Sequence, residues 1–489
     1  MRIRLRPKLV RRLVVLAIAA MVLALFGTNA LAQDEVALAT QASVDTTWVL
    51  LTGFLVFFMQ CGFAMLETGL IRQTSAVNAL LENFIDAGVT AVAFWAVGFG
   101  IAFGTSAGGL IGTSNFFLSD AIIIADGSVT FAKFGAYPNL DVLTMFFFQF
   151  AFAATASTIT TGAMAERTDF VGDLIYSAVM GAISYPIIVH WIWGGGWLAQ
   201  MGFHDFAGST VVHTVGGVTA IIGAWMLGPR KSRIGKNGEW KPLPAPHNLG
   251  LATIGAMILW FGWYGFNPGS TLGTANTGLI GLVTLNTTLG AAGGTLSCMF
   301  MQYFRSKKWD LVYTLNGSLA GLVAITAGCA FVSPVAALLI GAVGGVLVIY
   351  AADFVERIKI DDPVGAFAVH GACGIWGTLA IGLFGMPGLT YGVEATVGGG
   401  LLYGGGISLL GVQAVGSLAT ILFTGVFAVV MFGALKAFGH LHVSSKVDDF
   451  SVFIDDFEHG QAIQPDIRPA KSLDEGGYAD SVAAPAAGD

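Results

Sequence analysis

Two histidines lie in matching sequence contexts and are the residues best suited to do chemistry in this chain. The segments Asp205–His213 and Asp362–His370 both follow the pattern Asp-x-x-Gly-x-x-x-Val-His. Eight residues separate each aspartate from its histidine, or about 12 Å along a helix, enough to reach from a membrane face towards the middle of a ~30 Å apolar core. Because ionisable groups at that depth are usually functional, the pattern predicts a paired imidazole site.

Such a pair could bind a metal, bind haem or relay a proton between two imidazoles. No carboxylate accompanies either histidine at the spacing of metal ligands, and nothing else in the sequence supports haem. A proton relay in a hydrophobic pore fits best. We therefore expect no resident metal and no cofactor.

The composition places this site in a membrane. Of the 489 residues, 55% are hydrophobic and only 11% are charged, against roughly 25% charged in a soluble protein. The mean hydropathy is +0.74. These values exclude most soluble enzymes and predict a polytopic membrane protein. The 67 glycines favour close helix packing, since small residues let membrane helices approach one another.

Eleven apolar segments are expected to cross the bilayer, which puts the two ends of the membrane domain on opposite sides. The segments lie near 47–71, 80–105, 142–164, 170–198, 207–228, 248–267, 275–303, 311–331, 334–353, 366–387 and 406–436.

Basic residues gather in alternate loops between these segments, and such loops face the cytoplasm. The other loops hold essentially Lys133 alone. We therefore expect a multi-pass protein of the cell (inner) membrane, with the N-terminus outside and the C-terminus in the cytoplasm. The basic loops hold Arg72, Arg167, the cluster within 230–241, the cluster within 305–308, Arg357 and Lys359.

The chain divides into three parts. Residues 1–32 combine six basic residues, an apolar run over 13–26 and Ala30-Leu31-Ala32, which is typical of a cleavable signal peptide, although an uncleaved anchor is the alternative. Residues 33–440 form the membrane domain. Residues 441–489 form a cytoplasmic, acidic, partly disordered tail, because from Lys446 on ten acidic residues stand against three basic ones.

The two Asp-to-His segments open the fifth and tenth expected spans. The tenth span comes five spans after the fifth, an odd number, so the two segments enter the membrane from opposite faces. This predicts an all-α polytopic fold of eleven transmembrane helices, built as an inverted five-plus-five repeat with an added C-terminal helix. Repeats of this kind place the transport site at their interface near the midplane.

Several segments resemble the Amt branch of the Amt/Mep/Rh ammonium transporter superfamily. The resemblance implies an eleven-helix homotrimer with one pore per subunit, in a lipid bilayer, that carries ammonium or ammonia. It implies neither an enzyme nor a nucleic-acid partner. The matching segments are 59–69, 162–167, 205–213 with Arg230, 262–270 and 370–377.

The resemblance also assigns residues of an outer recruitment site and a gate. Phe152 and Trp193 match the aromatic residues of an external vestibule, and Ser270 matches the hydroxyl that completes it. Phe266 matches the second ring of a phenylalanine gate, stacked on Phe152. Ammonium would be recruited there, deprotonated, and passed inward as ammonia.

The deeper pore residues carry over in the same way. His213 and His370 match the twin pore histidines, and Asp205 matches the acidic residue below the recruitment site. We expect Asp205 to be half buried and to stabilise positive charge. Asp362 is its inner counterpart, but Gly365 stands where many members carry a second acidic residue, which leaves the role of Asp362 open.

The tail carries the last point of resemblance. Residues 456–462 loosely resemble a regulatory segment, with Gln461 in place of an acid, so a PII-type signalling protein is a possible partner. The sequence does not choose between electrogenic transport and passive ammonia conduction. The alternative function is an ammonium sensor that signals through this tail.

Overall fold

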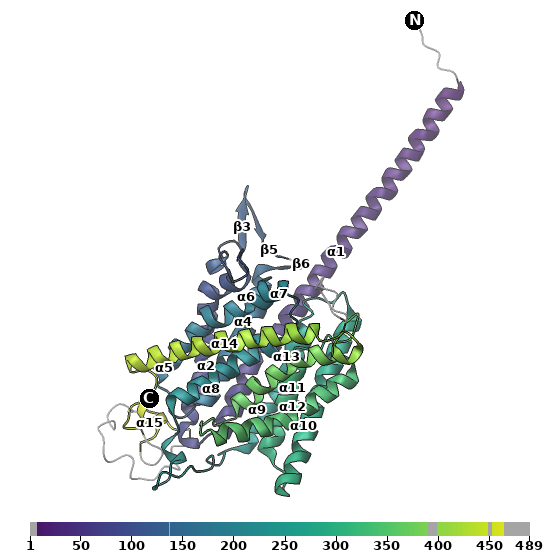
Figure 1. Cartoon of the computed structure of the whole chain (residues 1–489). Helices are drawn as coiled ribbons and strands as arrows, with labels where there is room; N and C mark the ends of the chain where they lie inside the picture. Colours follow the sequence, from purple (N-terminus) through teal and green to yellow (C-terminus); the bar gives the residue numbers. More distant parts are fainter. Residues whose placement is uncertain (1–6, 136, 390–398, 448–451, 464–489) are drawn as a thin grey trace, which may run out of the picture.

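The computed structural model describes residues 7–135, 137–389, 399–447 and 452–463. In this part of the chain, ten helical stretches are long and apolar enough to cross a membrane, and a shorter apolar helix, α11 (Leu311–Thr326), completes the bundle. The expected eleven-helix membrane body is therefore confirmed (Figure 1).

Four of the crossing stretches contain a π-helical segment. The helices of the body are α1 (Pro7–Leu70), α2 (Ala76–Ala93), η2 (Phe94–Gly98), α3 (Phe99–Phe103), α4 (Val142–Met164), α5 (Phe170–Val179), η4 (Met180–Ser184), α6 (Tyr185–Ile192), α7 (Trp197–Gln200), η5 (Ser209–Thr214), α8 (Val215–Leu227), α9 (Leu249–Gly269), α10 (Thr277–Ser306), α12 (Pro334–Arg357), η7 (Phe367–Ala372), α13 (Cys373–Phe384) and α14 (Ser408–Phe438).

Helix α1 continues through the region of the expected signal peptide. It begins at Pro7 and its N-terminal part projects away from the bundle (Figure 1). The structure is that of the full chain, so cleavage after Ala32 stays a prediction.

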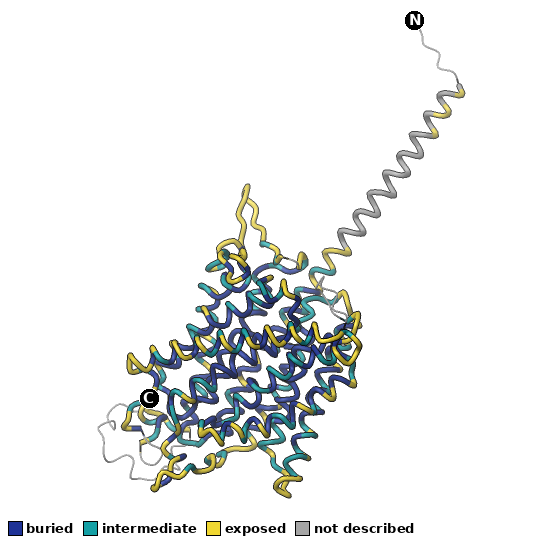
Figure 2. Tube along the Cα trace, in the orientation of Figure 1, coloured by how far each residue is buried: buried dark blue, intermediate teal, exposed yellow. Residues whose placement is uncertain are grey.

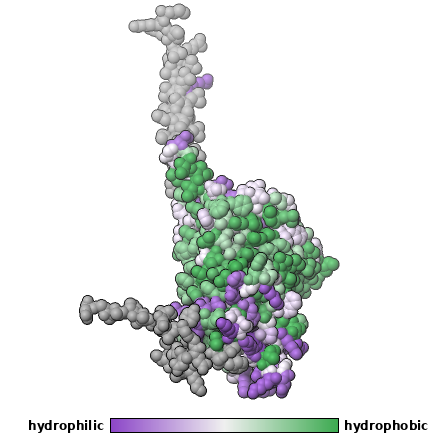
Figure 3. Space-filling model, turned by 90° about the vertical axis from the view of Figure 1, so that its left-hand side faces the viewer, coloured by the Kyte–Doolittle hydropathy of each residue, from purple (hydrophilic) through white to green (hydrophobic). Residues whose placement is uncertain are grey.

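Close helix packing follows from the glycines, as expected. A Cβ atom on Gly255 of α9 would overlap the backbone of Leu66 on α1, and one on Gly341 of α12 would overlap the carbonyl of Gly290 on α10. The interior of the bundle is accordingly buried throughout (Figure 2), and an apolar band covers the side seen in Figure 3.

Short β-hairpins cap one end of the bundle, which we call the hairpin face. They were not predicted, because their strands are only two to five residues long. The antiparallel pairs are β1 (Ser106–Ala107) with β2 (Ile111–Gly112), β3 (Ile122–Ala125) with β4 (Ser128–Phe131), and β5 (Lys133–Phe134) with β6 (Tyr137–Asp141).

Part of the acidic tail is helical and packs against the opposite end, which we call the tail face. Helix α15 (Ile454–His459) lies on the start of α2, where the Asp455 carboxylate accepts hydrogen bonds from the backbone N–H groups of Val77 (3.0 Å) and Asn78 (2.8 Å). A carboxylate at a helix N-terminus is favourable because it meets unpaired N–H groups and the positive end of the helix dipole. Residues 464–489 of the expected disordered tail lie outside the described residues.

A buried ion-pair cluster joins the loops of the tail face. The Arg230 guanidinium lies 3.0 Å from the Glu166 carboxylate and 2.8 Å from that of Asp361, while Arg72 also pairs with Glu166. Burial alone would raise the pKa of Asp361, but hydrogen bonds from Arg230 and the charge of Arg167 lower it to about 2. Basic residues that the sequence assigned to alternate loops thus meet acidic partners in one place.

Replacement of Arg230 by alanine is expected to destabilise the fold by about 3–5 kcal/mol, because it removes the cation that two buried carboxylates share. Unfolding in mixed detergent micelles measures this. Arg305→Ala is the matched control, since the pair with Asp353 is partly exposed and is worth about 0–1 kcal/mol. Equal effects of the two variants would contradict a structural role for the cluster.

The same cluster makes the stability of the fold depend on pH. The folded pKa of Asp361 lies below its ordinary value of 3.8, so its stabilisation is complete above that value and is lost as pH falls through about 2.

Candidate functional site

The two predicted histidines meet inside the bundle. His213 on η5 and His370 on η7 are buried, their Nδ1 atoms are 3.1 Å apart, and their ring centroids are 5.2 Å apart with planes inclined by 28°. At this Nδ1–Nδ1 distance one ring donates the proton and the other accepts it. Both histidines lie on π-helical turns, which are frequent at functional sites. The predicted pairing is confirmed.

Each histidine segment begins with a carboxylate that caps its helix. Asp205 accepts hydrogen bonds from four successive backbone N–H groups, those of residues 208–211, at 2.8–3.0 Å. Asp362 accepts three, from residues 365–367, each at 3.0 Å. Asp205 is only 5% exposed, so the expectation of a half-buried carboxylate was wrong. Four amide donors compensate the cost of burying it.

The repeated glycine of the pattern has a backbone reason. Gly208 has a φ of +116° and Gly365 one of +79°, in the left-handed region where a side chain is disfavoured. An acidic residue in place of Gly365 would be strained in this conformation. The shared Asp-x-x-Gly sequence therefore encodes a turn that lets the aspartate reach back to cap the helix.

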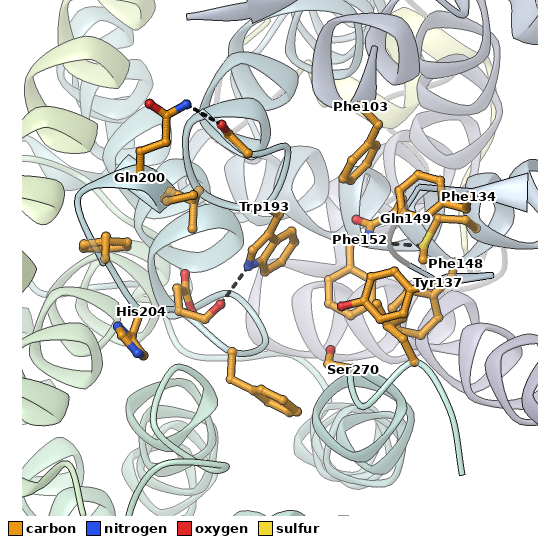
Figure 4. A pocket seen from close by; sticks show the side chains of 18 of the residues that line it. Phe103, Phe134, Tyr137, Phe148, Gln149, Phe152, Trp193, Gln200, His204 and Ser270 are labelled. Atoms are coloured by element: carbon orange, nitrogen blue, oxygen red, sulfur yellow. Dashed lines mark hydrogen bonds between the residues drawn. The ribbon is translucent and has the colours of Figure 1, made fainter. Parts of the chain in front are cut away.

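A cavity of about 590 Å³ opens on the hairpin face and contains the predicted recruitment residues (Figure 4). Phe152 and Trp193 meet edge to face with centroids 6.0 Å apart. The Trp193 indole donates a 2.7 Å hydrogen bond to the backbone carbonyl of Asp205, which fixes the ring. Ser270 donates to the carbonyl of Phe266 at 2.7 Å, so its oxygen remains free to accept a hydrogen bond from a donor in the cavity.

Other aromatic side chains line the same cavity, and the sequence analysis did not assign them. In the sequence these residues are only aromatic positions scattered over several elements. The tertiary fold brings them together around the cavity. They are Phe103, Phe134, Tyr137, Phe148, Phe203, Phe206 and Phe331, joined by His204.

Two stacked rings separate the cavity from the histidine pair. The centroids of Phe152 and Phe266 are 4.1 Å apart, and both side chains are fully buried. Phe266 lies 5.4 Å from the His213 ring. Trp263, which lies in the matching segment 262–270 but had no expected role, stacks on His213 at 5.3 Å and donates to Thr326 at 2.8 Å. The residues thus follow one another from the cavity inward.

This arrangement defines a class of protein. It is a multi-helix membrane protein with an aromatic cavity on one face, closed by a stacked ring pair above a buried histidine pair. Asp205 lines the cavity of the hairpin face, and Asp362 adjoins the ion-pair cluster of the tail face, so the two histidine segments start at opposite ends of the bundle. An inverted repeat has this geometry.

The Ammonium Transporter Family matches residues 47–463, and the chain belongs to that family. It is therefore a multi-pass membrane protein of ammonium transport and not an enzyme. Ammonium transporter Amt2 of Archaeoglobus fulgidus is 43% identical over 74% of this chain and 76% of its own length. A putative ammonium transporter of Synechocystis, sll1017, is 39% identical over 90% of this chain and 94% of its own.

Solved structures agree with this assignment. A Sensor Amt Protein matches with a TM-score of 0.76 and 38% identity, over 83% of this chain and 96% of its own. Mep2 of Candida albicans matches with a TM-score of 0.73 and 28% identity, over 83% and 87%.

Replacement of Asp362 by alanine removes the cap of η7 and is expected to cost about 0.5–2 kcal/mol of stability, whereas Asp362→Asn, which keeps one acceptor oxygen, costs less. Unfolding in micelles compares the two variants. If Asp362→Ala abolishes ammonium flux without any loss of stability, the carboxylate acts on the transported species and not as a cap.

Proposed function

We propose that this protein transports ammonium by recruiting it in the outer cavity, removing a proton and conducting ammonia past the histidine pair. The single observation that carries the proposal is the buried His213–His370 pair directly behind the stacked rings of Phe152 and Phe266. A buried apolar barrier followed by paired imidazoles suits a small neutral molecule that accepts hydrogen bonds.

Recruitment needs a feature that separates ammonium from potassium, which has a similar size. Cation–π attraction to Trp193 and Phe152 is worth about 1–2 kcal/mol when partly desolvated, but it acts on both ions. The free oxygen of Ser270 accepts a hydrogen bond from ammonium and finds no donor on potassium. The cavity therefore favours the ion that carries protons.

Passage through the barrier then selects the neutral form. Moving a bare ion into the apolar core costs on the order of 20 kcal/mol by Born arithmetic, whereas a neutral amine costs a few. Ammonium can lose a proton at the gate, and potassium cannot. The two imidazoles provide hydrogen-bonding nitrogens for ammonia and a chain for the proton, which makes net transport of ammonia plus a proton electrogenic.

Orientation and assembly belong to the same proposal. The hairpin face with its cavity lies outside, and the tail face lies in the cytoplasm, consistent with the basic loops gathered there. The functional unit is a homotrimer, as the family resemblance implies. A PII-type protein would bind at the tail face.

A second candidate function is ammonium sensing. Two observations favour it: the 38% identity to a Sensor Amt Protein, and the packing of α15 of the tail against the start of α2. Growth of a transporter-deficient strain on low ammonium, with the full chain and with a chain ending at Lys446, separates the two. A transporter restores growth, whereas a pure sensor restores none.

In proteoliposomes, the wild-type protein is expected to carry ammonium and methylammonium but no potassium, and to generate current. His213→Ala is expected to lose transport or to lose its discrimination against potassium, because it removes one member of the proton and ammonia path. Flux and solid-supported membrane currents measure both properties.

The matched control is His247→Ala, since His247 lies at the tail face, where its Nδ1 is 3.1 Å from the Ile71 carbonyl. Its flux should equal that of the wild type, and Phe266→Ala tests the ring barrier separately. Unchanged flux and selectivity in His213→Ala would remove the histidine pair from the mechanism. Uptake without charge movement would contradict electrogenic transport and favour passive conduction of ammonia.

A further inference from the structure

One face of α2 carries a buried column of polar side chains that the pore does not use. Asn78, Glu82, Asp86 and Thr90 recur every fourth residue, and each is at most 2% exposed. Residues at this spacing lie on one side of a helix, so the column extends over about 18 Å. Helices α1, α4 and α5 pack against α2, so the column faces protein and not lipid.

Part of this column is satisfied by hydrogen bonds. The Asp86 carboxylate accepts from the hydroxyls of Ser157 (2.7 Å) and Thr158 (2.5 Å) on α4. The Glu67 carboxylate of α1 accepts from Asn83 (2.9 Å) and Thr161 (2.8 Å). Hydroxyl and amide donors therefore stabilise these two carboxyl groups where they lie.

The remaining carboxyl groups, those of Glu82 and Asp173, have fewer donors beside them: the Asn78 side chain for Glu82 and the Tyr176 hydroxyl for Asp173. Glu82 and Asp173 are 2% and 1% exposed, and Asp173 is the acidic group whose charge acts most strongly on the Glu82 carboxyl, while Asp86 is the one that acts on Asp173. Tyr176, one turn after Asp173 on α5 and fully buried, directs its hydroxyl at the same group of acids. Among the described residues, Oε1 of Glu82, both oxygens of Asp173 and the Tyr176 hydroxyl have no hydrogen-bond partner in ordinary geometry.

Positive side chains do not compensate this group either. In the part of the chain that the structure describes, none of the carboxyls of Glu67, Glu82, Asp86 and Asp173 forms an ion pair. The described residues also contain no set of three or more ligands placed to hold a metal ion. An isolated ionised carboxylate in an apolar interior costs several kcal/mol, so a positive species must accompany this group.

We propose that Glu82 and Asp173, with the Tyr176 hydroxyl, form a proton-binding site that is separate from the histidine pore. A proton needs no cavity, unlike ammonium or a metal ion. It turns one carboxylate into an O–H donor, which then bonds to the facing carboxylate or to the tyrosine oxygen. The bound proton therefore provides the hydrogen-bond donor that the neighbouring side chains do not. Acidic side chains inside membranes serve as proton carriers by the same chemistry.

The tail face closes the cytoplasmic end of the column. Asn78 bonds to the Glu82 side chain, and its own Oδ1 lies 2.8 Å from Nε2 of His459 on α15. Protons would therefore enter between α2 and α15. The titratable groups that face the site are Glu67 of α1, Glu82 and Asp86 of α2, Asp173 and Tyr176 of α5, and Asp455 and His459 of α15, while α4 contributes hydroxyls.

Infrared spectroscopy of the full protein in lipid membranes tests the proposal directly. At about pH 7 the wild type is expected to show protonated-carboxyl absorption that shifts in heavy water. Glu82→Gln and Asp173→Asn, which keep the side-chain shapes, should each remove a component of this band. Asp126→Asn is the matched control, because Asp126 lies in the exposed β3–β4 turn and should change nothing.

The wild-type spectrum alone decides the matter even if a variant fails to fold. Absence of protonated-carboxyl absorption at about pH 7 overturns the proposal, as does a band that survives in both folded variants. Loss of the band when ammonium, sodium or potassium is added would assign the oxygens to a cation and also overturn it. The proton site is independent of the transport mechanism, because its infrared band is read without measuring flux through the pore.

Discussion

Each of the two buried histidines depends on a carboxylate that caps the start of its helix. The backbone turns at a glycine with positive φ three residues after Asp205 and after Asp362. Each aspartate can therefore accept hydrogen bonds from the N–H groups that the first helical turn leaves unpaired. Inside a membrane these groups have no water to bond, so a helix that begins at membrane depth needs such a cap. The two caps place η5 and η7 so that the imidazoles meet at 3.1 Å.

Aromatic side chains pack around this pair. Phe152, Phe266 and Trp263 leave His213 in contact with rings on its outer side. An ion is costly in such surroundings, and a neutral molecule that bonds to imidazole nitrogen is not. The cavity above is different, because the indole of Trp193 and the oxygen of Ser270 remain available to a cation. The recruitment and conduction that we propose therefore use separate chemistry a few side chains apart.

Charge elsewhere in the molecule is tolerated in two ways. At the tail face, Arg230 compensates Glu166 and Asp361 directly, and the loops that carry them are tied together. Along α2, the acids have only hydroxyls, amides and one another, which is why a proton is the positive species we assign to them. Helix α15 packs on the start of α2, where His459 contacts Asn78 at the cytoplasmic end of the acidic column.

The sequence by itself determined the membrane class, the eleven helices and the candidate residues of the pore. Hydropathy, loop charge and the repeated Asp-to-His pattern are local properties, and a bilayer forces local hydropathy into structure because unpaired backbone groups cannot face lipid. Phe152, Trp193, Phe266 and Ser270 were named through family resemblance; in the structure Phe152, Trp193 and Ser270 line one cavity and Phe266 packs against Phe152.

Only the tertiary structure decided how the polar groups are satisfied. The sequence left the role of Asp362 open and wrongly placed Asp205 half in solvent, because a cap depends on a backbone turn that the residue types alone do not specify. It gave no role to Trp263, to the acids of α2 and α5 or to the docking of α15. Those features arise from side chains that are far apart in the chain, and only packing brings them into contact.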